Sequence, residues 1–200
     1  MRYRDKYINF ARLAEIEREG SDFSIEVSAL AGSDIAIMAP HGGKIEFLTN
    51  ELASAIAGDD FSFYAFIGTK VRHNRSLHIT STNFDEPRAL CLAKSCNVVL
   101  TIHGLSGDGE RIEIGGLNVN VRDSVNASLR AADFDINIAK NGAYSGTEVS
   151  NICNKGKSRA GVQLEIQAGL RSRMSADADA FDAFVAAVRA GITAQAPNST

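Results

Sequence analysis

The chain has 200 residues, 44% of them apolar, and a formal net charge of −3. This length and composition fit one globular domain, and the slight negative charge argues against a protein that coats nucleic acid. No apolar run is long enough to span a bilayer, and no secretory signal follows the charged N-terminus, so we expect a cytoplasmic protein with no membrane partner. The three cysteines lack the spacing of a disulfide framework or a metal knuckle. An anionic substrate is still compatible with the net charge, because its site needs only a local cluster of Arg and Lys.

The first half of the chain alternates predicted helices and strands. Apolar residues spaced by three predict a short helix over residues 7–19, and alternation predicts a half-exposed edge strand over 23–30. The apolar run at 35–39 predicts a buried strand, which Pro40 ends. Beyond it we expect a helix over 49–57 capped by Thr49 and ended by Gly58, a strand over 61–67 and a short strand over 77–80.

The second half continues this alternation. Asp85, Glu86 and Pro87 form a helix-start pattern, so we expect a helix from there to about Ser95. The continuous β-branched run at 97–104 is the most strand-like segment of the chain. The other predicted elements are a short strand at 112–114, a helix carrying Val121, Val125 and Leu129, a short strand at 134–139, a polar loop at 140–160, a strand at 162–167 and a helix carrying residues 181–192.

Strands that alternate with helices predict an α/β fold, here a single domain with a mixed, mostly parallel sheet flanked by helices on both faces. We expect this domain to cover residues 1–194 and residues 195–200 to form a disordered tail. The polar loop at 140–160 is long for a compact domain, which is more typical of a functional loop than of a simple connection.

Two of the four histidines come directly after predicted buried strands, and each is followed by glycine. His41 and Glu46 share the bent segment after the first of these strands, and His103 ends the second. Loops at the carboxyl ends of strands build the sites of α/β folds. Two histidines and one glutamate leave an open fourth position on zinc, as in hydrolytic sites. Either histidine alone would be typical of a polar loop, but the pair favours a metal site.

Glu165 lies in an otherwise apolar predicted strand. Alternation places it on one face with Gln163 and Gln167, which is compatible with the wet face of an edge strand. The residues leave this interpretation as open as a functional one. In a functional role, Glu165 fits a general base that moves a proton from water to a leaving amine.

Several other side chains are candidate substrate contacts. Arginine offers a bidentate fork to carboxylates, although each of these residues is also typical of a solvated surface. The candidates are Arg75, His78, Arg88, Asn118, Tyr144, Asn154 and Arg159. Familiar nucleotide and serine-hydrolase motifs fail, since a P-loop would need glycine in place of Asn151 and residues 104–108 do not match G-x-S-x-G.

Five segments together resemble the phage-type poly-γ-glutamate hydrolase family. They are residues 40–46 (PHGGKIE), 77–87 (LHITSTNFDEP), 102–104 (IHG), 115–118 (GGLN) and 161–166 (GVQLEI). Their order over most of the chain is more specific than any one of them. The resemblance implies a zinc-carboxypeptidase-like fold, hydrolysis of γ-glutamyl amide bonds, zinc on His41, Glu46 and His103, and Glu165 as the base.

The resemblance also bears on the substrate. Zinc carboxypeptidases usually space their first two ligands as His-x-x-Glu, whereas four residues separate His41 from Glu46 here. Their Asn-Arg pair for a terminal carboxylate is not recognisable, so we expect an endo-acting enzyme on an anionic γ-glutamyl polymer. Two alternatives stay open: a zinc amidohydrolase of a small N-acyl-glutamate, N-acyl-aspartate or cell-wall γ-glutamyl link, and a non-catalytic zinc-containing binding protein. A phage-encoded protein would be released by lysis, and the sequence leaves the oligomeric state open.

Overall fold

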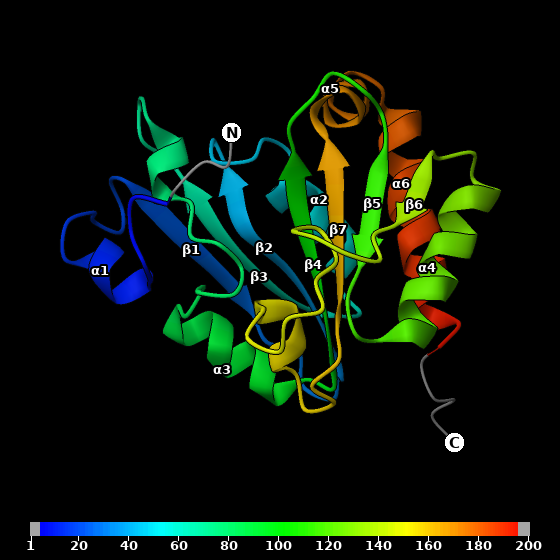
Figure 1. Ribbon diagram of the computed structural model, residues 1–200, viewed down its shortest axis with the longest axis horizontal. Coiled ribbons are helices and arrows are strands. Elements are labelled where there is room, and N and C mark those ends of the chain that lie inside the picture. The colour runs from blue at the N-terminus through cyan, green and yellow to red at the C-terminus, as the bar shows by residue number, and fades with distance from the viewer. Residues whose placement is uncertain (1–4, 196–200) are drawn as a thin grey trace.

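Seven strands form one mixed sheet in the order β1-β3-β2-β4-β7-β5-β6 in a computed structural model that describes residues 5–195 (Figure 1). The strands are β1 (Phe23–Ser28), β2 (Ile35–Gly43), β3 (Ser62–Gly68), β4 (Val98–Leu105), β5 (Ile112–Gly115), β6 (Ile136–Ile138) and β7 (Val162–Gln167). The predicted α/β class with a mixed, mostly parallel sheet is confirmed, and β1 is the predicted edge strand.

The three strands β2, β4 and β7 are parallel neighbours at the centre of the sheet. Figure 1 shows that their carboxyl ends reach the same edge of the sheet. In the pairing of β4 with β7, His103 lies directly beside Glu165. The topology therefore gathers the chemistry-bearing ends of distant segments at one edge, as expected for parallel strands.

Helices cover both faces of this sheet. One face packs against α2 (Thr49–Ala57), α4 (Val119–Ala131), α5 (Ala168–Ala176) and α6 (Ala178–Thr193), and the other against α1 (Phe10–Ala14), α3 (Pro87–Ser95) and the 3-10 turns η1 (Asn74–Leu77) and η2 (Ile152–Lys155). Two separate apolar clusters result, because alternate residues of each strand point to opposite faces. On β4, for example, Leu100 belongs to one cluster and Val99 to the other.

Local signals set several boundaries. Glu86 caps α3 by accepting a hydrogen bond from the amide of Ala89, with Pro87 in the first turn. Gly58 ends α2 at a positive φ of 49°, as the sequence predicts. The predicted cap of α2 is wrong: Leu48 occupies the cap position, and Thr49 is the first helical residue, its hydroxyl donating to the Glu46 carbonyl.

Four further expectations differ from the structure. The helix expected over 7–19 is limited to α1, residues 77–80 form no strand, and β2 continues through Pro40. Pro40 is tolerated because the register of β2 with β3 shifts between Ala39 and Gly42, so no ladder hydrogen bond is needed from it. Helix α5 was not predicted from the sequence. Of the expected tail at 195–200, all but Gln195 lies outside the described residues.

Among the described residues, no helix is both long and apolar enough to cross a membrane.

Candidate active site

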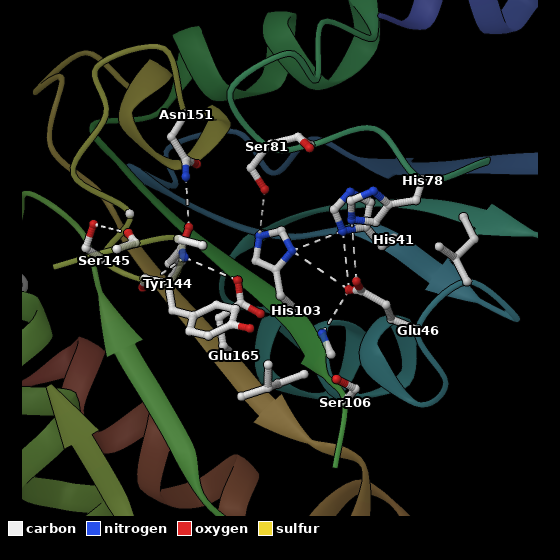
Figure 2. A pocket seen from close by; sticks show the side chains of 18 of the residues that line it. His41, Glu46, His78, Ser81, His103, Ser106, Tyr144, Ser145, Asn151 and Glu165 are labelled. Carbon is white, nitrogen blue, oxygen red and sulfur yellow. Dashed lines mark hydrogen bonds and ion pairs between the residues drawn. The ribbon is translucent and has the colours of Figure 1, made fainter. Parts of the chain in front are cut away.

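A cleft of about 1400 Å³ opens at the carboxyl ends of β2, β4 and β7. One wall, the strand wall, carries His41, His103 and Glu165 on strands and Glu46 on the turn after β2. The opposite wall, the loop wall, is formed by the loop at 140–151, which contributes Tyr144. Figure 2 shows His41, Glu46 and His103 turned towards one another, with Glu165 and Tyr144 beside His103.

The turn after β2 returns Glu46 to His41. Gly43 has a positive φ of 65°, and a Cβ atom there would lie 2.7 Å from the Gly68 carbonyl oxygen, so both the conformation and the space require glycine. The amide of Glu46 then donates to the carbonyl of His41 over 2.9 Å. This turn absorbs the four residues between the two side chains.

Three ligand atoms converge at the end of the strand wall. The Nδ1 atoms of His41 and His103 lie 3.1 Å apart. The Oε2 atom of Glu46 lies 3.2 Å from the first and 3.9 Å from the second. Ligand atoms about 2.0–2.1 Å from a tetrahedral zinc are about 3.3 Å from one another, so these three separations fit a shared zinc ion.

The outer contacts of the two imidazoles agree with this fit. His41 donates from Nε2 to the carbonyl of Ile79 over 2.8 Å, which leaves an electron pair on Nδ1. His103 has its Nε2 atom 3.4 Å from the Ser81 hydroxyl. With the His103 proton on Nε2, two nitrogen electron pairs and one carboxylate oxygen meet, an arrangement that a cation stabilises.

The pKa shifts of His103 and Glu46 favour the forms of these side chains that bind a metal ion. Burial and the neighbouring His41 lower the pKa of His103 to about 3, which keeps this imidazole in its neutral, metal-binding form. Burial opposes ionisation of Glu46, but the surrounding histidines His41, His103 and His78 together outweigh it and hold the pKa of that carboxyl far below its usual range. Glu46 also accepts a hydrogen bond from the amide of Gly104 over 2.8 Å and one from Arg75 over 3.2 Å.

His78 provides an alternative ligand. Ligand atoms of His41, Glu46 and His78 lie within 4.8 Å of one another, and the His78 ring lies over that of His41 with centroids 4.1 Å apart (Figure 2). Its Nε2 atom is 3.7 Å from Glu46, and its Nδ1 atom is hydrogen-bonded to Asp5 over 2.6 Å. We favour His103, because its Nδ1 atom and that of His41 face each other at ligand spacing.

Glu165 lies on a central strand, so its interpretation as part of the wet face of an edge strand is wrong. Its carboxyl is turned to the cleft and accepts a hydrogen bond from Gln163 over 3.3 Å. Burial, with the charge of Glu46, raises the pKa of Glu165 well above its usual value. A carboxyl with raised proton affinity beside a candidate metal site suits proton transfer.

Of the candidate substrate contacts, the structure brings three into the cleft. Arg75, His78 and Tyr144 line it, with Arg75 and Tyr144 both exposed. The loop at 140–160, expected to be functional, supplies most of the second wall through residues 140–148.

The other four candidates do not line this cleft and have structural contacts instead. Arg88 pairs with Glu19 and Glu86 beyond the sheet edge. The remaining three are Asn118, which caps α4 through Val121, Asn154, which is buried and bonded to loop carbonyls, and Arg159, which is exposed at a φ of 55°.

Sequence reasoning missed several cleft residues. Ser81 contacts His103, Gln163 contacts Glu165, and Arg171 lies buried beneath the strand ends. Gln163 could have been found from its alternation with Glu165 on one strand. Ser81 and Arg171 meet the site only through tertiary contacts, which no local pattern signals.

Comparisons with known proteins agree with these observations. A sequence model described as poly-gamma-glutamate hydrolase matches residues 7–186. The UPF0714 protein YmaC of Bacillus subtilis (strain 168) is 36% identical over 163 residues, which cover 81% of this chain and 68% of YmaC. The structure of a bacteriophage poly-gamma-glutamate hydrolase superposes with a TM-score of 0.89 at 29% identity, covering 96% of this chain and 98% of the other. A zinc-free apo structure of YndL superposes with a TM-score of 0.91, also at 29% identity, covering 97% of this chain and all of YndL.

Proposed function

This chain belongs to the poly-γ-glutamate hydrolase family, and we propose that it is a zinc-dependent, endo-acting depolymerase of poly-γ-glutamate. The observation that carries the zinc is the meeting of His41 Nδ1, His103 Nδ1 and Glu46 Oε2 at mutual distances of 3.1–3.9 Å. The family match and the cationic lining of the cleft support poly-γ-glutamate as the substrate. The zinc-free apo form of YndL adds support, because YndL has the same fold.

The residues of the strand wall have two proposed roles, metal binding and proton transfer. His41, Glu46 and His103 would hold the ion, with Ile79 and Ser81 orienting the two imidazoles. Zinc held by these residues would supply a Lewis acid for an amide carbonyl and would lower the pKa of water to about 7. Glu165 takes a proton from the attacking water at its carboxylate and delivers it to the nitrogen of the leaving amine.

The lining of the cleft supports an anionic polymer. Each γ-glutamyl unit carries a free carboxylate, and the cleft presents cationic side chains on both of its walls. They are Lys44, Arg75 and Lys140. Arg75 is the first candidate for a carboxylate contact, since it is exposed next to Glu46 and offers a planar fork. A cleft with cations on two sides suits binding within a chain rather than at its end.

The first test is depolymerisation of poly-γ-glutamate by protein stripped with a chelator and then reloaded with zinc. The proposal expects loss of activity on stripping, recovery with zinc, and a rapid fall in polymer size from internal cuts. Cleavage of small N-acyl-glutamates with no cutting of polymer would favour the small-substrate amidohydrolase instead. Full activity of the zinc-free protein would refute zinc dependence.

Glu165→Gln separates an enzyme from a binding protein. We expect zinc to be retained and kcat to fall by about 10²- to 10⁴-fold, the usual contribution of a general acid–base group. Glu148→Gln is the matched control, because Glu148 lines the same cleft from the exposed loop. Equal turnover in the two variants would remove Glu165 from the mechanism.

A further inference from the structure

One buried guanidinium contacts all three segments that carry the proposed site. From α5, Arg171 donates to the carbonyl of Ile166 over 3.0 Å, of Phe47 over 2.5 Å and of Leu105 over 3.2 Å. Ile166 directly follows Glu165, Phe47 directly follows Glu46, and Leu105 lies two residues beyond His103. The three segments are far apart in the sequence and share this one side chain.

The packing around Arg171 leaves it little freedom. Its relative exposure is 6%. A Cβ atom on Gly104 would lie 2.8 Å from Arg171 Cζ and 2.8 Å from the Glu46 Cβ atom, so the guanidinium and the Glu46 side chain both need the space left by this glycine. The amide of the same glycine donates to Glu46. Arg171 is thus packed directly behind the metal-binding edge.

The contacts use the shape of the guanidinium. The three hydrogen bonds of the Arg171 guanidinium end on backbone carbonyls, and each uses a different nitrogen. A lysine ammonium is a point charge on a flexible stem and cannot reach three such acceptors in a fixed plane. Replacing arginine by lysine therefore keeps the charge and removes the set of hydrogen bonds that joins the three segments.

We propose that Arg171 is a positioning residue that sets the placement of Glu46, His103 and Glu165 relative to one another. The inference rests on the proposed function for its kinetic consequence. Outer contacts of a metal site typically change metal affinity or activity by about 10- to 100-fold when they are removed. The three carbonyls place Arg171 in this class, because its hydrogen bonds hold the backbone next to Glu46, His103 and Glu165 rather than their side chains.

Arg171→Lys is the test, with Arg173→Lys as its matched control. Arg173 lies on the same helix, but it is exposed and pairs with Glu110. In zinc-loaded, folded protein we expect Arg171→Lys to lower kcat on poly-γ-glutamate by about 10- to 100-fold, with KM changed by less than about threefold. Zinc affinity, measured by chelator competition, should fall by a similar factor, and Arg173→Lys should match the wild type in all three quantities.

A purely structural role makes a different prediction. Arg171→Lys would then melt at a lower temperature but keep wild-type kcat and zinc affinity when assayed well below its melting point, which would overturn the inference. If Arg171→Lys does not fold, Gly104→Ala takes its place, because the new Cβ displaces the guanidinium from the same pocket. A Gly104→Ala protein with wild-type kcat would also count against the proposal.

The outcome can be separated from failure of the proposed function. Wild-type protein that neither binds zinc nor cuts the polymer would refute the function alone. In that case the crystal structure of Arg171→Lys decides the inference: we expect the ends of β4 and β7 and the turn at Glu46 to shift relative to one another. An unchanged arrangement of the three segments would overturn it.

Discussion

The two walls of the cleft are built on different principles. The strand wall carries its functional groups on neighbouring parallel strands or on the tight turn that follows one of them, where backbone pairing fixes each position. The loop wall has no strand pairing and is held by side-chain amides: Asn154 donates to the carbonyls of Gly146 and Glu148, and Asn151 donates to Gln163. The proposed metal chemistry would need the fixed wall, whereas the proposed contact with a polymer would tolerate the adaptable one.

The largest difference should come from removing a metal ligand. His103→Ala on the strand wall is expected to lose stoichiometric zinc and to reduce polymer cleavage to the level of chelated protein, because two ligands rarely hold catalytic zinc. Metal analysis and the depolymerisation assay measure both effects. His73→Asn is the control, since His73 is exposed at a positive φ of 63° that asparagine also tolerates. Retained zinc in His103→Ala would contradict the ligand assignment.

Loosening the loop wall should leave the metal in place. Asn154→Ala removes the two hydrogen bonds to loop carbonyls and one from the amide of Gly161, and we expect a loss of about 1–3 kcal/mol in the free energy of unfolding. KM for polymer should rise while zinc affinity stays constant. Chemical denaturation measures the free energy of unfolding and chelator competition measures the zinc affinity. Asn83→Ala is the control, because Asn83 is exposed and does not line the cleft. A fall in zinc affinity would show that the walls are coupled.

A single rim side chain should have a smaller effect. Tyr144 lies 42% exposed on the loop wall, so Tyr144→Ala is expected to raise KM by roughly fivefold, the equivalent of about 1 kcal/mol of contact energy, with kcat unchanged. Steady-state kinetics on size-defined polymer measures this change. Tyr144→Phe separates the ring from its hydroxyl. A drop in kcat without a change in KM would place Tyr144 in the chemistry rather than in substrate contact.

The smallest expected effect is a loss of folding stability at acidic pH. Burial raises the pKa of Asp5, but hydrogen bonds from His78 and Thr80 outweigh it and lower the pKa to about 2. A carboxyl with a lowered folded pKa contributes stability above its unfolded pKa of about 3.8, and this contribution is lost as the pH falls towards 2. We expect about 1 kcal/mol after allowing for solvent screening. The protection factor of the Thr80 amide, which donates to Asp5, should fall over this range in hydrogen exchange, and Asp5→Asn should remove this pH dependence.

The sequence predicts the strand wall better than the loop wall. The buried runs of β4 and β7 and the capping pattern of α3 are local signals, whereas the pairing of β4 with β7 that sets His103 beside Glu165 comes from the structure. The resemblance to the poly-γ-glutamate hydrolases is confirmed by the family match. The metal and base roles of these residues stay predictions.

Other features depend on tertiary contacts that periodicity does not encode. Pro40 sits inside β2 because a register shift removes the need for its missing amide. Arg88 was assigned to substrate because arginine suits carboxylates, yet Glu19 and Glu86 already pair with it. Helix α5 has weak amphipathic character, with Leu170 and Met174 as its buried apolar residues, so neither the helix nor Arg171 was predicted.

Diffraction data collected on either side of the zinc absorption edge, from crystals grown with zinc, test the central claim most directly. The proposed site predicts one strong anomalous peak within about 2.0–2.2 Å of His41 Nδ1, His103 Nδ1 and a carboxylate oxygen of Glu46. A peak coordinated by His78 with His103 turned away would replace the ligand set. No peak at this edge of the sheet, in protein that cuts the polymer, would contradict the account.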